Sequence, residues 1–213
     1  MSTFFEPGKT YHVYTHANGF ENLFRCDRNY LYFLDKYQKY TNPIADTYAY
    51  CLMPNHLHLQ IKIKSTEKVL DFLKTKHPHL QAFHSPGDFS LAISRQFSHL
   101  FNGYTQAYNK MYNRMGGLFM HQFKRKEVDS LDYFKQLLFY IHNNPVKAGL
   151  ASSMADWNYS SYHFYVGNKK NLIVNPEHVL QVIGGIEAFE ELHRKNKLAK
   201  PFIKMVEDFQ LLL

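Results

Sequence analysis

Cysteine is scarce in this chain of 213 residues, and its scarcity limits both fold and compartment. The two cysteines, Cys26 and Cys51, form no CxxC pair, which excludes a disulfide framework as the source of stability. No apolar run approaches the length of a bilayer span, so we expect no membrane insertion. The N-terminus also lacks a basic region followed by an apolar stretch. A reducing cytoplasm is therefore the expected location.

Acidic residues are missing from one long stretch. Between Asp88 and Glu127 there are none, while the net charge of the chain is +7 and its pI is about 9.2. A one-signed run is often only a solvated surface, but its length favours contact with a polyanion, most simply nucleic acid. The residues that we predict to bind DNA are Lys62, Arg95, Lys110, Arg114, Lys124, Arg125 and Lys126.

The rest of the composition fits an ordinary globular protein. Hydrophobic residues make up 45% of the chain, which is enough for one core with appendages. The 16 Tyr and 18 Phe are abundant enough to stack on bases, although a core rich in aromatic residues is the simpler interpretation. There is no internal repeat or low-complexity tract.

Hydrophobic periodicity predicts the order strand, helix, strand, strand, helix for the first part of the chain. This order is typical of a ferredoxin-like α+β fold, in which helices cover one face of an antiparallel sheet and leave the other face free. Pro78, Pro86 and Gly87 predict a loop over 77–89, and Pro145 should end a helix near Asn144. The expected strands are 11–15, 47–52, 56–64 and an extended segment within 118–126, and the expected helices are 27–41, 66–73, 90–111 and 130–144.

The C-terminal part is expected to be a helical extension. Helices are predicted over 178–196 and 202–212. We therefore divide the chain into a catalytic domain over 1–167 and an extension over 168–213. The basic cluster Arg194-Lys195-Asn196-Lys197 either contacts DNA or solvates a helix end.

Two histidines stand at the head of the most regular strand pattern. In 56–64, Leu57, Leu59 and Ile61 alternate with His56 and His58, so both imidazoles leave the same face of a sheet. Neutral imidazole is a good ligand for divalent metals, and the pair predicts two points of a metal site. The alternative, two histidines on a solvated sheet face, is about as well supported by spacing alone. The similar His77-Pro78-His79 step is interpreted as a solvated loop, because its proline disfavours a central strand.

A tyrosine and an amide lie one helical turn apart further along the chain. Tyr140 and Asn144 share one side of the predicted helix, away from its apolar stripe. A phenol with a pKa near 10 attacks phosphate poorly unless a metal polarises the scissile group. The histidines could hold that metal with Asn144 as an oxygen ligand, which would permit covalent phosphodiester cleavage. Considered alone, Tyr140 is more simply a tyrosine that packs against the sheet.

Several motifs together resemble a known family. Tyr50-Cys51-Leu52-Met53-Pro54-Asn55-His56-Leu57-His58-Leu59 and Tyr140-Ile141-His142-Asn143-Asn144-Pro145-Val146-Lys147-Ala148-Gly149-Leu150 resemble the signatures of HUH single-tyrosine transposases. Leu118 to Lys124 and Trp157 to Tyr162 resemble the "LFQGRFKS" and "WSSY" elements of one branch, the tyrosine transposases associated with repetitive extragenic palindromes. The resemblance covers roughly residues 10 to 167. It departs at His16-Ala17-Asn18-Gly19, which lacks the arginine of an "RGN"-like segment, and at Asn144, where the wider family usually has glutamine.

The resemblance implies an enzyme that cleaves and rejoins single-stranded or hairpin DNA with Mg or Mn. By motif, His56 and His58 bind the metal, Asn144 holds the third-ligand position, and Tyr140 becomes linked to a 5′-phosphate while a 3′-hydroxyl is released. Such an enzyme would associate with the nucleoid through DNA, and a homodimer is one expected assembly. The alternatives are a catalytically inactive regulator that binds hairpin DNA and a two-histidine phosphoesterase without a covalent intermediate.

Overall fold

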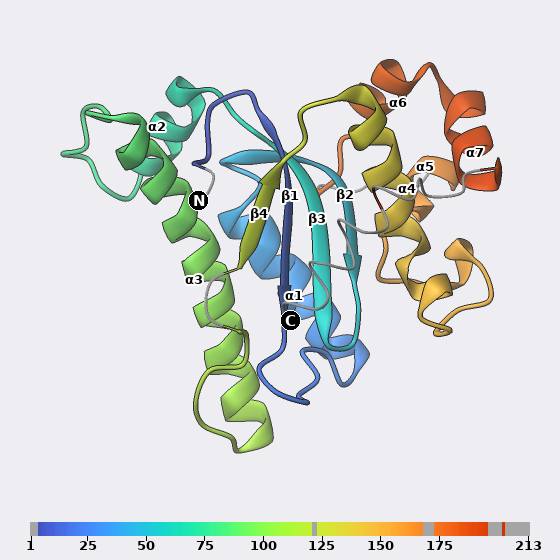
Figure 1. Cartoon of the computed structure of the whole chain (residues 1–213). Coiled ribbons are helices and arrows are strands. Elements are labelled where there is room, and N and C mark those ends of the chain that lie inside the picture. Colours follow the sequence, from blue (N-terminus) through green and yellow to red (C-terminus); the bar gives the residue numbers. More distant parts are fainter. Residues whose placement is uncertain (1–3, 121–122, 168–172, 196–201, 203–213) are drawn as a thin grey trace.

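The computed structural model describes residues 4–120, 123–167, 173–195 and Phe202. It contains a four-stranded antiparallel sheet with the strand order β2-β3-β1-β4 (Figure 1). The strands are β1 (Thr10–His16), β2 (Ala45–Leu52), β3 (His56–Ile63) and β4 (Lys124–Glu127). The helices are α1 (Asp27–Tyr40), α2 (Thr66–Lys74), α3 (Pro86–Tyr112), α4 (Leu131–Lys147), α5 (His163–Val166), α6 (Pro176–Ile183) and α7 (Ile186–Lys195), with a short 3-10 helix η1 (Met154–Asp156).

One face of the sheet forms the main core with α1 and α3. Leu57, Leu59, Ile61 and Ile63 point to this face and are almost fully buried. The Tyr37 hydroxyl on α1 bonds Thr47 Oγ1 on the same face at 2.7 Å. α1 and α3 also pack against each other, and Figure 1 shows α1 behind the sheet and α3 along the β4 flank. This arrangement confirms the predicted ferredoxin-like α+β class.

The second face of the sheet is not free, so that part of the prediction is wrong. α4 packs over β2 and β3, and Gln60 Nε2 donates a hydrogen bond to Phe134 O on α4 at 3.3 Å. His58 and Gln60 are buried. The physical reason is that α4 carries its own apolar side chains, including Leu137 and Ile141, which need a surface that α1 and α3 have left uncovered.

The end of α4 also differs from the prediction. The helix does not stop near Asn144 but continues through Pro145 to Lys147. Asn144 and Pro145 are both buried, and this packing outweighs the modest preference of a residue before proline for extended backbone. The helix ends instead at Ala148 and Gly149, and Gly149 has a φ of +70°.

Two further boundaries were predicted wrongly. α3 begins at Pro86, inside the expected loop, because Ser85 caps it by accepting a hydrogen bond from Asp88 N and proline suits the first helical turn. The expected helix over 178–196 is two helices, α6 and α7, separated by Gly184 and Gly185, each with a φ of +102°. The predicted helix over 202–212 lies outside the described residues except for Phe202.

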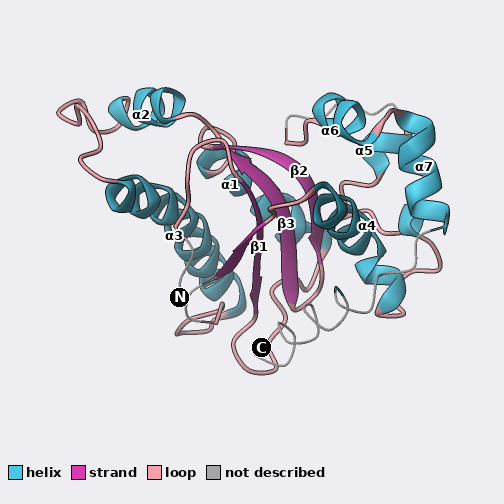
Figure 2. Cartoon of the chain, turned by 45° about the horizontal axis from the view of Figure 1, so that its top comes forward, coloured by secondary structure: helices cyan, strands magenta, loops and turns pink. Residues whose placement is uncertain are grey.

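The helices α6 and α7 lie on the side of α4 that faces away from the sheet (Figures 1 and 2). Val179, Ile183 and Phe189 are buried in the same hydrophobic core as the sheet. Asn175 N donates to Thr47 O on β2, which ties this segment to the sheet edge. The division of the chain after residue 167 remains a prediction. No described helix is both long and apolar enough to cross a membrane.

Candidate active site

The face of the sheet beneath α4 carries a row of histidines. In the β1–β3 pairing, His16 lies opposite His56 and Tyr14 lies opposite His58. His12, two residues before Tyr14, points to the same face. The hairpin turn between β2 and β3, closed by a hydrogen bond from Met53 N to His56 O, fixes the register of β3 against β2.

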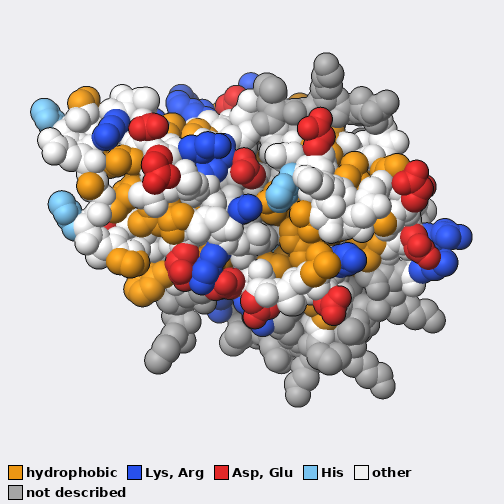
Figure 3. Space-filling model, turned by 90° about the horizontal axis from the view of Figure 1, so that it is seen from above, with side chains coloured by type: hydrophobic (Ala, Val, Ile, Leu, Met, Phe, Trp, Pro, Cys, Tyr) orange, Lys and Arg blue, Asp and Glu red, His pale blue; other side chains and the backbone are white. Residues whose placement is uncertain are grey.

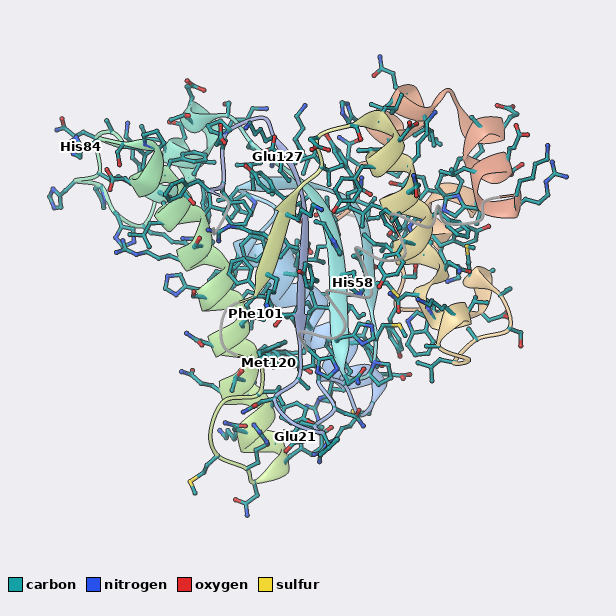
Figure 4. The ribbon with its side chains drawn as sticks, viewed as in Figure 1. Glu21, His58, His84, Phe101, Met120 and Glu127 are labelled. Atoms are coloured by element: carbon teal, nitrogen blue, oxygen red, sulfur yellow. The ribbon has the colours of Figure 1, made fainter. Side chains whose placement is uncertain are left out.

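His58 lies between a second histidine and the predicted nucleophile. Its Nδ1 is 3.0 Å from His12 Nε2, and its Nε2 is 3.4 Å from the Tyr140 hydroxyl on α4. Figure 4 shows His58 on the α4 side of the sheet. Tyr140 and His58, which are 82 residues apart in sequence, therefore meet within one chain. This is the juxtaposition that covalent cleavage by a tyrosine requires, and spacing in the sequence could not establish it.

His56 meets Asn144, the predicted third ligand. His56 Nδ1 is 2.8 Å from Asn55 Oδ1, and His56 Nε2 is 3.3 Å from Asn144 Oδ1. Both partners are amide oxygens, which only accept hydrogen bonds, and a neutral His56 has one N–H, so it can donate to Asn55 or to Asn144 but not to both. The His56 ring also stacks on His16, with 5.8 Å between ring centroids.

The site holds its histidines neutral. Burial lowers the pKa of His12 to about 3 and that of His56 to about 4. Burial, followed by the neighbouring histidines, also lowers the pKa of His58 well below its ordinary value. At neutral pH these imidazoles therefore keep the lone pairs that metal binding needs.

Tyr140 is unsuited to attack without help. Burial raises the pKa of its hydroxyl well above the ordinary value, and Asn144 only partly offsets this effect. The side chain is 1% exposed, and the ring of Phe202 contacts it with 5.8 Å between centroids. A positive charge near the hydroxyl would be needed to stabilise the phenolate.

The donor atoms around Asn144 fit a divalent metal. His56 Nε2 and Asn144 Oδ1 face each other at 3.3 Å, and both atoms would be available to a cation when the His56 proton is on Nδ1. The Asn144 Nδ2 is buried and has no hydrogen-bond partner. Among the described residues no group of three or more His, Cys, Asp or Glu side chains could hold a metal, so any such site depends on this amide oxygen with His56 and His58.

The predicted DNA-binding residues are not all on one surface. Lys124 pairs with Tyr14 and Lys126 with His12, so both lie on the histidine face, as does Lys62 opposite Thr10. Arg125 points to the opposite face, where its guanidinium lies 4.4 Å from the centroid of the Phe5 ring.

Three further predicted residues lie on or after α3, on the other side of the sheet. Arg95 and Lys110 are exposed on this helix. Arg114 forms an ion pair with Glu21 at 3.1 Å. A groove of about 910 Å³, which includes Lys124 and Arg125 in its lining, separates α3 from the β1–β4 edge, where Figure 4 places Phe101 and Met120. On the face seen in Figure 3, basic and acidic side chains are intermixed.

Sequence reasoning missed three residues of the site. His12 orients His58, Asn55 orients His56, and His16 stacks on His56. The alternation of His12, Tyr14 and His16 in the first strand was a usable signal, because it places all three on one face. Their partners depend on the register with β3, which no local pattern reveals.

Comparisons with known proteins support the fold. No protein-family model matches the chain, and no curated protein matches it. A solved structure of a tyrosine transposase associated with a repetitive extragenic palindrome (REP), bound to a REP hairpin, is similar at a TM-score of 0.57 and 15% sequence identity. The match covers 82% of this chain and 90% of that one. The chain therefore shares its fold with a protein of the group that its sequence motifs resemble.

Proposed function

We propose that this protein is a metal-dependent DNA transposase, or nicking and joining enzyme, that cleaves single-stranded or hairpin DNA through a 5′-phosphotyrosine intermediate. The observation that carries the proposal is the meeting of Tyr140 with His58, and of Asn144 with His56, beneath one helix. The shared fold with a hairpin-bound tyrosine transposase supports the same class of substrate.

The chemistry follows from the groups present. The Tyr140 hydroxyl loses its proton as its oxygen attacks the scissile phosphorus, the bond to the 3′-oxygen breaks, and that oxygen takes up a proton to leave as a 3′-hydroxyl, so the step consumes no net proton. A 3′-hydroxyl reverses the step by attacking the phosphotyrosine, so the bond energy is conserved and no external energy source is needed. A bound Mg²⁺ or Mn²⁺ would neutralise charge on the phosphate.

Neighbouring residues of the chain prepare this reaction. His12 Nε2 lies 3.0 Å from His58 Nδ1, and a metal on His58 Nε2 would require His12 to accept the Nδ1 proton of His58. Lys62, Lys124 and Lys126 lie on the same face of the sheet and could contact the phosphates that flank the scissile bond.

The proposal is tested by trapping the covalent adduct. Labelled hairpins with single-stranded extensions, selected from a random library by binding, are incubated with the protein and Mn²⁺, and denaturing gels report covalently bound DNA. The wild type should form an adduct on Tyr140, located by mass spectrometry of the peptide, and Tyr140→Phe should form none.

The matched control is Tyr133→Phe, which removes another buried hydroxyl of α4, one with no hydrogen-bond partner. This variant should retain the adduct. An adduct that persists in Tyr140→Phe would contradict the proposal. Tight hairpin binding without any adduct in the wild type would instead select the inactive regulator, and turnover without an adduct would select the two-histidine phosphoesterase.

A further inference from the structure

His142, two residues after Tyr140, has no part in the proposed chemistry, yet it is fully buried and both of its ring nitrogens are bonded. Its Nε2 is 2.8 Å from Ser161 Oγ, and its Nδ1 is 2.9 Å from His193 Nε2 on α7. His193 Nδ1 in turn is 2.8 Å from Phe189 O. Four groups from α4, α7 and the segment before α5 thus form one continuous chain of hydrogen bonds.

The acceptor at the end of this chain determines where its protons lie. Phe189 O can only accept, so His193 carries its proton on Nδ1, and its Nε2 accepts from His142 Nδ1. Both rings are buried without a carboxylate in the hydrogen-bond chain and are therefore neutral, which leaves His142 Nε2 as an acceptor for the Ser161 hydroxyl. Every donor therefore points from Ser161 toward Phe189.

Ser161 connects this chain to the sheet. Its Oγ accepts a hydrogen bond from Tyr50 N at 2.9 Å, and its own N–H donates to Tyr50 O. Tyr50 precedes Cys51, which pairs with His58 in the β2–β3 register. The serine is thus attached to the edge strand next to the strand that carries the site histidines.

The position of His142 on α4 couples its hydrogen bonds to the orientation of Tyr140 and Asn144. At 3.6 residues per turn, residues two places before and after His142 point about 160° away from it around the helix axis. Tyr140 and Asn144 are those residues. A rotation of α4 that moved them off His58 and His56 would pull His142 out of its bonds to Ser161 and His193.

We propose that His142 is a positioning residue: the Ser161–His142–His193 chain fixes the rotation of α4 and so holds Tyr140 and Asn144 against the two sheet histidines. The inference rests on the function proposed above. It assigns a role to the histidine of the second motif and to a serine of the tryptophan-serine-tyrosine element, and it makes α7 part of the support of the reaction centre. The competing interpretation is a buried polar cluster that contributes to stability alone.

A matched pair of serine variants separates the two interpretations. Ser161→Ala removes a buried hydroxyl that accepts a backbone N–H, and Ser90→Ala removes another, which accepts Phe5 N at 2.9 Å far from the site. At equal folded fraction, Ser161→Ala should slow adduct formation by about a hundredfold, because small displacements of reacting groups have effects of that size. Hairpin affinity should change little, and Ser90→Ala should cleave at the wild-type rate.

Two conservative variants of His142 test which bond matters. The amide of Gln reaches the place of Nε2 and can still bond Ser161, whereas the shorter Asn can replace only the bond of Nδ1 to His193. His142→Gln should therefore recover most of the cleavage rate lost in His142→Ala, and His142→Asn should not. Equal rates in all three variants would overturn the proposal.

A readout without catalysis keeps the inference separate from the proposed function. Tyr140 is replaced with 3-fluorotyrosine, and its ¹⁹F resonance is recorded in the full-length protein without DNA. The resonance should shift in the Ser161→Ala background and stay in place in the Ser90→Ala background. If it stays in both, α4 has not moved and the positioning role is wrong. A wild type that forms no adduct would refute only the proposed function.

Discussion

At the scale of single residues, the proposed site depends on the residues that contact the Nδ1 atoms of His56 and His58. A histidine that binds a metal through Nε2 needs its Nδ1 proton bound elsewhere, and His12 Nε2 and Asn55 Oδ1 lie within hydrogen-bond distance of the Nδ1 atoms of His58 and His56. The sequence motif predicted the two ligands, but the residues that contact their Nδ1 atoms come from a separate strand and from the hairpin turn.

Replacing His12 should therefore weaken metal binding without removing a ligand. In His12→Ala, Mn²⁺ affinity measured by titration should fall by about 10-fold to 100-fold, because His58 loses the acceptor that fixes its tautomer. His12→Gln, whose amide oxygen can accept that proton, should retain more affinity. His99→Ala, on the exposed surface of α3, serves as the control and should bind as the wild type. An unchanged affinity in His12→Ala would show that His58 needs no support from β1.

The buried histidines also predict how stability depends on pH. The pKa of His56 is lowered from 6.5 to about 4 in the folded protein. The unfolded chain therefore binds protons first as the pH falls, and the contribution of neutral His56 to stability, complete above about pH 6.5, is lost toward pH 4. The melting temperature should decrease over this interval, and less steeply in His56→Gln. Parallel profiles for the two proteins would contradict this expectation.

At the scale of elements, α4 is the least predictable and the most consequential. Its apolar residues were recognised from periodicity, but its passage through Pro145 and its position on the histidine face were not. Both depend on burial against β2 and β3, which outweighs local preference.

The start of α4 offers a direct test of a local rule. Ser130 caps the helix by accepting a hydrogen bond from Tyr133 N at 3.2 Å. Ser130→Ala should lower the free energy of unfolding by about 1 kcal/mol, as measured with urea. Ser98→Ala, an exposed serine inside α3 that donates to Ser94 O, should change it by less than about 0.5 kcal/mol. Equal effects would mean that the cap contributes nothing.

Replacing glycine with alanine should have opposite effects on stability at two positions. Gly185 has a φ of +102°, where a side chain is strained, so Gly185→Ala should destabilise the protein by more than about 1 kcal/mol. Gly103 lies within α3, and an added Cβ would meet nothing within 4 Å, so Gly103→Ala should stabilise it by about 0.4 to 1 kcal/mol. Chemical denaturation of the two variants measures the sign of the change in the free energy of unfolding for each. A stabilising Gly185→Ala would contradict the geometry between α6 and α7.

At the scale of the whole molecule, one chain contains every residue of the proposed site. Tyr140 and His58 are 3.4 Å apart without a partner subunit. The expected homodimer remains a prediction, and this site does not require it.

Mixing inactive variants tests this property. If the site is formed within one chain, Tyr140→Phe mixed with His58→Ala should form no adduct, because neither protein has both groups. As controls, each variant is mixed with the wild type. Each control mixture should form the adduct in proportion to the fraction of wild-type protein in it. Restored adduct formation in the first mixture would show that the tyrosine acts beside a partner's histidines.

The sequence by itself determined the α+β class and the face that His56 and His58 share, because both follow from the hydrophobic periods of strands and helices. It also predicted Tyr140 as the nucleophile and Asn144 as the third metal ligand, because short motifs point to them. Only the tertiary structure decided that α4 covers the histidine face, that His12 holds His58, and that Ser161 and His193 hold His142. These contacts join residues 19 to 88 positions apart in the sequence. Such pairings depend on strand register and on competition for buried surface, which are properties of the whole chain.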